Sequence, residues 1–198
     1  MGIIYCIMRY ARQHKAQTHQ RIVKNAARRF RALGVNGAGV ARVMQASGLT
    51  VGGFYKHFRS KDDLLVEAVG ESLCEIRERM LSCARQAPPG EAWKEMVRSY
   101  LSVEHCEHPE AGCPIAALAP DISRAKPSVR KRITGVMKEH QDQILALVPG
   151  RNAVEKERNF ILAITAMAGA VSFARTMTDP VAKQKVLDTV RDHLLESF

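Results

Sequence analysis

Four side chains near the middle of the chain could do chemistry: His105, Cys106, His108 and Cys113. Imidazole and thiolate groups bind zinc, but this spacing matches no standard zinc arrangement. A cysteine near a histidine could also be an activated nucleophile. No residue at a recognisable spacing would orient the histidine or stabilise an oxyanion. We therefore expect neither a metal site, nor a cofactor, nor an enzyme.

Cys113 directly precedes Pro114, and proline is favoured at the first position of a helix. If a helix begins there, Cys113 is its N-cap, where free N–H groups and the helix dipole stabilise a thiolate. Cys113 is then a candidate sensor of oxidants or electrophiles. A small buried hydrophobic residue is the alternative, and the sequence does not separate the two.

The charged residues are distributed unevenly along the chain. Residues 1–61 contain twelve of the 30 Lys and Arg residues and none of the 20 Asp and Glu residues, so 18 bases and 20 acids remain in 62–198. A basic segment of this kind favours a polyanion as partner, through long-range attraction and counterion release. The distribution therefore favours nucleic acid over a membrane surface, and over a merely solvated basic face.

The composition is that of a globular protein in a reducing compartment. Hydrophobic residues make up 46% and charged residues 25%, which argues against disorder. No run of 18 apolar residues occurs, and the short apolar opening lacks the features of a signal peptide. The five cysteines are odd in number and irregularly spaced, which indicates free thiols. We therefore expect a cytoplasmic protein with no membrane partner.

Helical periodicity dominates the sequence, so we predict an all-α fold. Three helices are expected in an N-terminal head: about 15–33, ended by Gly34, then 40–47 and 50–57, with Gly48 in the turn between the last two. Six are expected in the body: 60–87, 91–106, one from 114, one from 127, 152–175 and one from 179. The predicted domains are 1–61 for the head and 62–198 for the body.

Two short helices joined by a tight turn with glycine are typical of the helix-turn-helix unit, whose second helix enters the major groove. Residues 48–65, GLTVGGFYKHFRSKDDLL, resemble the motif of the TetR family. The resemblance extends back through Ala26, Ala27, Phe30 and Gly34 and covers about residues 16–70. It implies a helix-turn-helix DNA-binding head followed by a six-helix body for effector binding and dimerisation.

The resemblance and the residue types together indicate which side chains contact DNA. Thr50 can donate to a phosphate, and the small Gly52 and Gly53 allow close approach to the groove. The family's usual phosphate contact falls on Tyr55, for which core packing is the alternative. His57 is expected to point outward, or to sit at a solvent-facing helix end. The complete predicted set is Arg42, Thr50, Val51, Gly52, Gly53, Tyr55, Lys56, His57 and Lys61.

The chain departs from the family pattern at two places. Ala38 and Gly39 stand where the family commonly has two hydroxyl residues, and Val51 stands where it often has lysine. Val51 could touch a thymine methyl group instead. The operator sequence is therefore not transferable from other members. A basic arm could compensate by following phosphates or the minor groove; its residues are Arg9, Arg12, Lys15 and Arg21.

In the body, two features suggest binding surfaces. The small residues of 152–175 would let helices approach closely, and Val186, Leu187, Val190 and Leu194 would supply an apolar seam, so we expect a homodimer through the last two helices. Packing within one chain is the alternative. The candidate ligand or sensor residues are Trp93, Met96, Tyr100, Cys113, Met137 and Met167, although aromatic and Met residues at this spacing also suit a plain core.

The predicted function is sequence-specific transcriptional regulation. A small molecule, or modification of a cysteine, would favour a body conformation whose two heads no longer fit a palindromic operator. One alternative is a non-specific nucleic-acid-binding protein, which would show a steep salt dependence without sequence preference. Another is a helical enzyme with Cys113 as nucleophile and His105 or His108 as base, which leaves the acid-free head unexplained.

Overall fold

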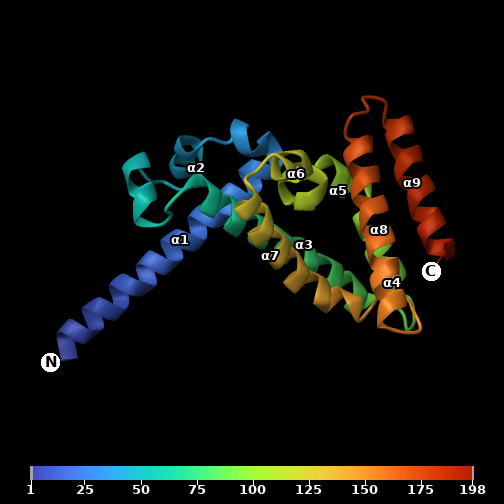
Figure 1. The fold of residues 1–198 in the computed structure, drawn as a ribbon, viewed down its shortest axis with the longest axis horizontal. Coiled ribbons are helices and arrows are strands. Elements are labelled where there is room, and N and C mark those ends of the chain that lie inside the picture. The colour runs from blue at the N-terminus through green and yellow to red at the C-terminus, as the bar shows by residue number, and fades with distance from the viewer. Residues whose placement is uncertain (1, 198) are drawn as a thin grey trace.

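The structure, a computed structural model, describes residues 2–197, and its side chains are described from residue 13 onward. Over this range the chain is helical without strands, so the predicted all-α fold is confirmed (Figure 1). The elements are α1 (Gly2–Gly37), α2 (Val40–Ala46), the 3₁₀ helix η1 (Val51–Lys56), α3 (Lys61–Gln86), α4 (Ala92–Tyr100), α5 (Val103–Glu107), the 3₁₀ helix η2 (Pro109–Ala111), α6 (Pro114–Ser123), α7 (Pro127–Leu145), α8 (Ala153–Ala174) and α9 (Pro180–Ser197).

Several helix boundaries follow from capping residues visible in the sequence. The Ser60 hydroxyl accepts the Asp63 N–H at 3.1 Å and donates to the Asp63 carboxylate at 3.0 Å, which starts α3 as expected. Asn152 caps α8 by accepting the Glu155 N–H at 2.9 Å. Pro114 and Pro127 each occupy the first turn of a helix, as predicted.

Two predicted boundaries are wrong. The helix expected over 91–106 is two helices, because Ser102 caps α5 by accepting the His105 N–H at 3.1 Å. The first helix begins at Gly2 rather than near residue 15. Nothing between these positions stops a helix, because this segment contains no proline. Gly34 interrupts α1 as expected, with a φ of 72° that favours glycine.

The second short helix of the head also differs from expectation. It is a 3₁₀ helix over Val51–Lys56 rather than an α-helix over 50–57. Gly52 and Gly53 have low helix propensity, which disfavours a regular α-helical turn here. Thr50 lies at the N-cap position as predicted, but its side chain makes no capping hydrogen bond.

The buried apolar residues form two clusters that meet along α3. One contains the buried residues of α1, α2 and η1 with the start of α3, and it continues into α6 and α7 through Leu118 and Ile133. The other lies among α3, α4, α8 and α9, with Met80 as an α3 contribution. The first cluster includes residues beyond 61, so the two predicted domains share a core. The division into 1–61 and 62–198 therefore stays a prediction.

Figure 1 shows how this packing separates the two ends of the molecule. The head elements α1 and α2 lie at one end, and α8 and α9 form an antiparallel pair at the other. The long helices α3 and α7 run between them. Within the described residues, no helix has both the length and the apolarity needed to cross a bilayer.

Candidate nucleic-acid interface and ligand cavity

The turn between α2 and η1 has helix-turn-helix geometry. Gly48 has a φ of 67°, so the predicted need for glycine at the turn is confirmed. The N–H of the next residue, Leu49, donates to the Met44 carbonyl at 2.9 Å and closes the turn. Phe54 of η1 and Met44 of α2 are both buried in the head core. These inward side chains fix which residues of η1 face solvent.

The outer face of η1 carries most of the predicted contact residues. The Tyr55 side chain is 77% exposed, which excludes the alternative of core packing. Thr50, Val51, Gly52 and Lys56 are also exposed, so hydroxyl, methyl, backbone and ammonium groups are all accessible to a nucleic acid. Gly53 is half-buried, and a Cβ there would lie 3.6 Å from the Met44 side chain.

A groove between α1 and η1 brings together cations that are far apart in the sequence. Lys15 and Arg21 of α1 face Lys56 of η1 across it. These lysines, after burial and His19, lower the pKa of His57, which indicates a positive potential at this surface. The groove is lined by His14, Lys15, Thr18, Arg21, Leu49, Thr50, Gly53, Lys56 and His57.

His57 does not reach freely outward as expected. It is half-buried, its Nδ1 atom is buried without a hydrogen-bond partner, and its ring centroid lies 5.9 Å from that of His19. His19 in turn stacks on Phe58 and bonds to Glu67 of α3 at 2.6 Å. His57 therefore lines the groove wall, where only part of the ring is accessible.

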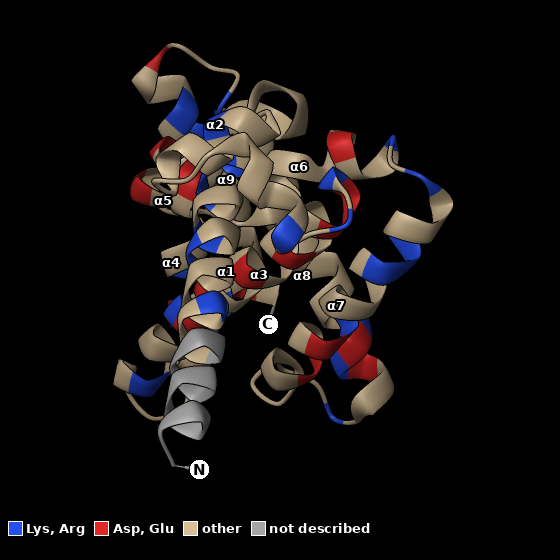
Figure 2. Cartoon of the chain, turned by 90° about the vertical axis from the view of Figure 1, so that its left-hand side faces the viewer, with Lys and Arg blue, Asp and Glu red and all other residues tan. Residues whose placement is uncertain are grey.

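The remaining predicted contacts lie at the edges of this surface. Arg42 is exposed, and one of its N–H groups donates to the Gly37 carbonyl at 3.0 Å. Lys61 is half-buried in the first turn of α3. The side chains of Arg9 and Arg12 lie outside the described residues. Figure 2 shows that Lys and Arg residues recur along α1, whereas the acids lie on later helices.

Arg31 is an exception among the basic residues of the head, because its side chain is fully buried. It donates to the Ala27 carbonyl at 3.1 Å and to the Gly112 carbonyl at 2.8 Å, and it pairs with Glu75 of α3. Arg31 is therefore not available to a nucleic acid. It joins α1 to the residue that precedes Cys113.

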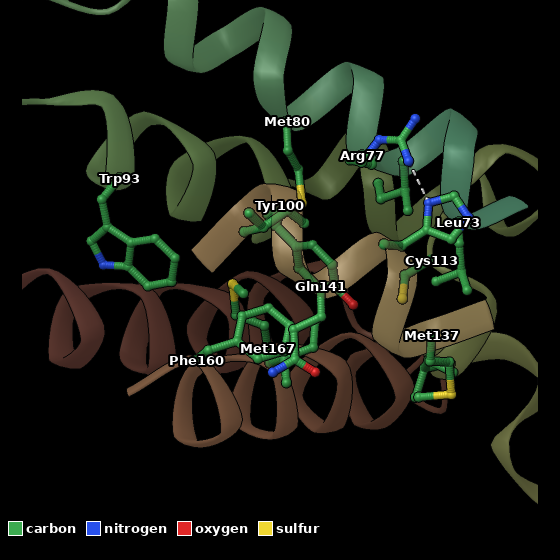
Figure 3. A pocket seen from close by; sticks show the side chains of 15 residues that line it. Leu73, Arg77, Met80, Trp93, Tyr100, Cys113, Met137, Gln141, Phe160 and Met167 are labelled. Carbon is green, nitrogen blue, oxygen red and sulfur yellow. Dashed lines mark hydrogen bonds between the residues drawn. The ribbon is translucent and has the colours of Figure 1, made fainter. Parts of the chain in front are cut away.

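The body contains a mainly apolar cavity of about 100 Å³ among α3, α4, α7 and α8 (Figure 3). Five of the six predicted ligand or sensor residues border it, namely Trp93, Tyr100, Cys113, Met137 and Met167. Met96 does not border the cavity and is fully buried elsewhere in the body core. The other lining residues are Leu73, Ile76, Arg77, Met80, Ile115, His140, Gln141, Ile144, Phe160 and Ile164.

The polar members of this wall, Arg77, His140 and Gln141, were missed in the sequence. Helical periodicity does not show whether these three polar residues face solvent or the protein interior. The sequence signal that could have drawn attention to them is weak: a charged residue one turn before Met80, within the buried stripe of α3. Only the packing of α7 against α3 brings them together.

Cys113 lies at the N-cap position of α6, as predicted from Pro114, but its environment is dry. The residue is 2% exposed and its side chain makes no capping hydrogen bond. The buried Tyr100 hydroxyl makes no hydrogen bond of normal geometry and has this weakly interacting thiol beside it. Burial, and then Cys113, raise the Tyr100 pKa well above its ordinary value.

His105 is held by both ring nitrogens. Nδ1 donates to the Tyr100 carbonyl at 2.6 Å, and Nε2 accepts the Cys113 backbone N–H at 2.9 Å. Burial lowers the His105 pKa to about 4, so the ring is neutral at pH 7. His105 is therefore not placed to deprotonate the thiol. Among the described residues, no group of His, Cys, Asp and Glu is arranged to hold a metal ion.

The exposed face of α8 is apolar. Ile161, Leu162 and Phe173 are each more than half exposed, and Thr165 and Gly169 lie between them on the same face. By contrast, the predicted seam on α9 points inward: Leu187 and Leu194 are buried in the chain's own core, and Val186 and Val190 pack against it. The seam residues expected on α9 are therefore wrong, and the exposed apolar surface belongs to α8.

A helical head that exposes hydroxyl, glycine and basic residues on its second short helix, attached to a helical body with a cavity, is a helix-turn-helix DNA-binding regulator in architecture. Residues 22–68 match the family described as bacterial regulatory proteins, tetR family. The N-terminal part of the chain is thus a DNA-binding head of the TetR type, and the resemblance inferred from the sequence is confirmed.

Similar proteins extend this assignment beyond the head. The HTH-type transcriptional regulator LmrA of Bacillus subtilis (strain 168) is 27% identical over 124 residues, which cover 62% of this chain and 66% of LmrA, just under two thirds of its length. A TetR transcriptional regulator of Chloroflexus aurantiacus J-10-FL matches with a TM-score of 0.69 and 27% identity, over 92% of this chain and 94% of that chain. A TetR-family regulator of Cytophaga hutchinsonii has the same fold, with a TM-score of 0.70 and 16% identity over 92% and 96% of the two chains.

Proposed function

We propose that this protein is a transcriptional repressor that binds a palindromic operator as a homodimer and leaves it when a small molecule occupies the body cavity. The observation that carries the DNA-binding part is the groove between α1 and η1, where Lys15, Arg21 and Lys56 converge beside the exposed Tyr55. Cations would contact phosphates, and the outer face of η1 would enter the major groove. We expect the protein to act in the cytoplasm, where such DNA is found.

Dimerisation is supported by the apolar face of α8. Large exposed apolar side chains on one helix are unfavourable in water and mark an interaction surface. Thr165 and Gly169 are small, so two copies of α8 could approach closely around Ile161 and Leu162. The head lies at the end of the chain away from α8, so a two-fold axis at α8 would leave both heads free of the dimer interface (Figure 1). Each head could then contact one half-site of a palindromic operator.

Arg31 supplies a physical connection between cavity and head. Its hydrogen bond to the Gly112 carbonyl ties α1 to the backbone beside Cys113, a residue of the cavity wall. Gly112 lies directly against the His105 ring, because a Cβ at this position would be only 2.8 Å from it. A ligand that displaces this wall would therefore move the end of α1 and change the separation of the two heads.

Modification of Cys113 is a second proposed route to the same change. The thiol borders the cavity but is otherwise buried, so only an electrophile small enough to enter the cavity would reach it. The adduct would then act as a bound ligand. Labelling with a small alkylating agent, followed by mass spectrometry, tests this idea. Cys113 should react, and its reaction should slow when the cavity is filled; labelling confined to Cys74 and Cys83 would contradict the proposal.

The first experiment is DNA binding by the purified full-length protein. DNA from upstream of its own gene is compared with scrambled DNA of equal length over a range of salt concentrations. Tyr55→Ala serves as the test variant, and Arg151→Ala, an exposed residue of the body, is the matched control. Preference for the upstream DNA that Tyr55→Ala abolishes and Arg151→Ala retains is the expected result.

Other outcomes separate the alternatives. If both DNAs bind equally, selection from random DNA distinguishes a distant operator from a non-specific nucleic-acid-binding protein. Absence of binding to any DNA at low salt would overturn the proposed function and would favour the enzyme hypothesis with Cys113.

A further inference from the structure

The cavity in the body has chemically different ends. Trp93 and Phe160 lie at one end, and Arg77 lies at the other (Figure 3). The end with Trp93 and Phe160 offers a ligand mostly apolar contact. Among the described residues that line the cavity, Arg77 is the only Lys, Arg, Asp or Glu, so an ionised ligand would be oriented by the end that contains it.

Arg77 is mostly buried, and not all of its N–H groups have a hydrogen-bond partner. Its side chain is 12% exposed and its Nε atom is buried without a hydrogen-bond partner. One terminal nitrogen donates to His140 Nδ1 at 2.6 Å, and the other donates to Glu78 at 3.0 Å and to Cys74 Sγ at 3.4 Å. Glu78 is more than half exposed, so water screens this pair and it contributes little. A largely buried guanidinium therefore faces the cavity region with its charge only partly compensated.

The neighbours of Arg77 add hydrogen-bonding capacity without adding negative charge. Burial, and then the Arg77 charge, lower the His140 pKa, whereas the exposed Glu139 raises it only in part. His140 is thus neutral and accepts from Arg77 through Nδ1, which leaves its Nε2–H as a donor. In the part of the chain whose side chains are described, the Gln141 amide makes no hydrogen bond, and it lines the same cavity.

We propose that the ligand of this cavity is a small amphipathic carboxylic acid, bound as its anion. The carboxylate pairs with Arg77 beside His140, and the apolar part fills the space lined by Trp93, Phe160 and Met167. A guanidinium matches the planar geometry of a carboxylate, and one guanidinium balances one charge. This inference rests on the proposed function of the cavity as the effector site.

The size of the cavity limits the ligand. Its volume of about 100 Å³ is somewhat less than the roughly 150 Å³ of an engineered cavity that binds benzene. An aromatic ring or a short alkyl chain therefore requires only a modest adjustment. Met80, Met137 and Met167 can make that adjustment, because unbranched Met side chains change rotamer easily.

Two matched pairs of probes test the charge preference: 3-phenylpropionate against 3-phenylpropanamide, and hexanoate against hexanamide. Trp93 is the chain's single tryptophan and borders the cavity, so its fluorescence reports binding there and not at the basic head. Calorimetry gives the affinity. We expect each acid to bind at least about tenfold more tightly than its amide, because charged hydrogen bonds are the stronger ones.

Variants of Arg77 test the assignment. Arg77→Gln should reduce the preference for the acid to near unity, and Arg77→Lys, which keeps the charge, should retain a part of it. Arg85→Gln is the matched control, since Arg85 is an exposed residue near the end of the same helix. Circular dichroism and melting curves identify any variant that fails to fold, in which case the wild-type comparison of acid and amide decides alone.

The outcomes separate this inference from the proposed function. Equal binding of acid and amide, or a preference that survives in well-folded Arg77→Gln, overturns the inference but leaves the cavity as a site for neutral effectors. If none of the four probes changes Trp93 fluorescence at millimolar concentration, both this inference and the assignment of the cavity as effector site fail.

Discussion

Tyr55 and His105 show how burial determines the role of two aromatic residues with polar atoms. Tyr55 sits on η1 with 77% of its side chain exposed, so its hydroxyl is free for a partner outside the protein. His105 is buried and uses both ring nitrogens to join Tyr100 to Cys113. We therefore expect Tyr55 to affect DNA binding and His105 to affect stability, and the two effects can be measured separately.

Removing only the hydroxyl group of Tyr55 tests its role in binding. We expect Tyr55→Phe to lower operator affinity about tenfold or more, because a hydrogen bond to a charged phosphate contributes about 1.5–3 kcal/mol. Stability should stay within about 0.5 kcal/mol, as is usual for exposed sites. Fluorescence anisotropy and thermal melting give the two quantities. A lower melting temperature with unchanged affinity would contradict the assignment.

The low pKa of His105 predicts a loss of stability in mild acid. Between pH 6.5 and about 4 the unfolded chain binds a proton at this residue and the native protein does not, so the free energy of unfolding falls as pH falls. The stability that the neutral His105 contributes is fully present above pH 6.5. Lowering the pH from 7 to 5 should reduce the free energy of unfolding by about 2 kcal/mol through this residue. Urea unfolding at these two pH values measures it.

His105→Gln should be less stable than the wild type at pH 7 but should lose less stability on going to pH 5. His57 and His140, whose pKa values are also lowered by burial, act in the same direction in both proteins, so the comparison isolates His105. His108→Gln, at an exposed position, is the control and should keep the wild-type pH dependence. An unchanged slope in His105→Gln would refute the assignment.

At the scale of helices, we expect two features to determine how the parts act together. One is the hydrogen bond from Arg31 of α1 to Gly112 before α6, and the other is the apolar face of α8. The first lies inside the chain and connects the cavity wall to the head. The second is exposed and would connect two chains. Substitutions should therefore affect coupling in one case and assembly in the other.

Arg31→Met should cost about 2–4 kcal/mol, because it leaves the Gly112 carbonyl buried without its donor and removes the partner of Glu75. The variant should also show faster hydrogen exchange around residues 103–113. Chemical denaturation and hydrogen-exchange mass spectrometry measure these effects. Arg28→Met, at an exposed position one turn earlier in α1, is the control. Equal behaviour of the two variants would refute a structural role for Arg31.

Leu162→Glu should produce a monomer. Leu162 is 54% exposed, so the carboxylate is tolerated in a single chain but would be buried at a dimer interface along α8. We expect the dissociation constant of the dimer to rise about a hundredfold or more, equivalent to about 2.7 kcal/mol. Sedimentation velocity measures it, with Thr189→Glu on the outer face of α9 as control. A dimer of unchanged affinity would place the interface elsewhere.

At the scale of the whole molecule, the charge distribution separates DNA binding from the rest. All twelve bases of residues 1–61 are on the head side and every acid comes later, so one end attracts DNA while the other does not. Because Arg31 is buried, the cations available to DNA are fewer than the sequence suggests. The salt dependence of operator binding gives the number of cations that contact phosphates.

Lys56→Ala should make operator binding less sensitive to salt. Each lost phosphate contact reduces the slope of log K against log salt by about 0.9, and a dimer loses one in each head, so the slope should decrease by about two. Arg151→Ala removes an equal charge from the body and should leave the slope unchanged. Titrations by anisotropy at four salt concentrations measure the slopes. Equal slopes for Lys56→Ala and wild type would exclude a phosphate contact.

The sequence by itself determined the helical plan, the turn at Gly48, the helix starts near Ser60 and Asn152 and the location of the basic head. These features depend on local propensity, on hydrogen bonds between residues a few positions apart and on charge composition. It also indicated most of the aromatic and Met residues around the cavity, because periodicity predicts which side of a helix is apolar.

Only the tertiary structure decided which neighbours each apolar or charged side chain contacts. It buried Arg31 against Gly112, turned Leu187 and Leu194 of α9 into the chain's own core, and placed Met96 away from the cavity. It also brought Arg77 and His140 together from positions 63 residues apart. The reason is physical: periodicity predicts that a face is covered, but the packing of distant helices determines which neighbour covers it.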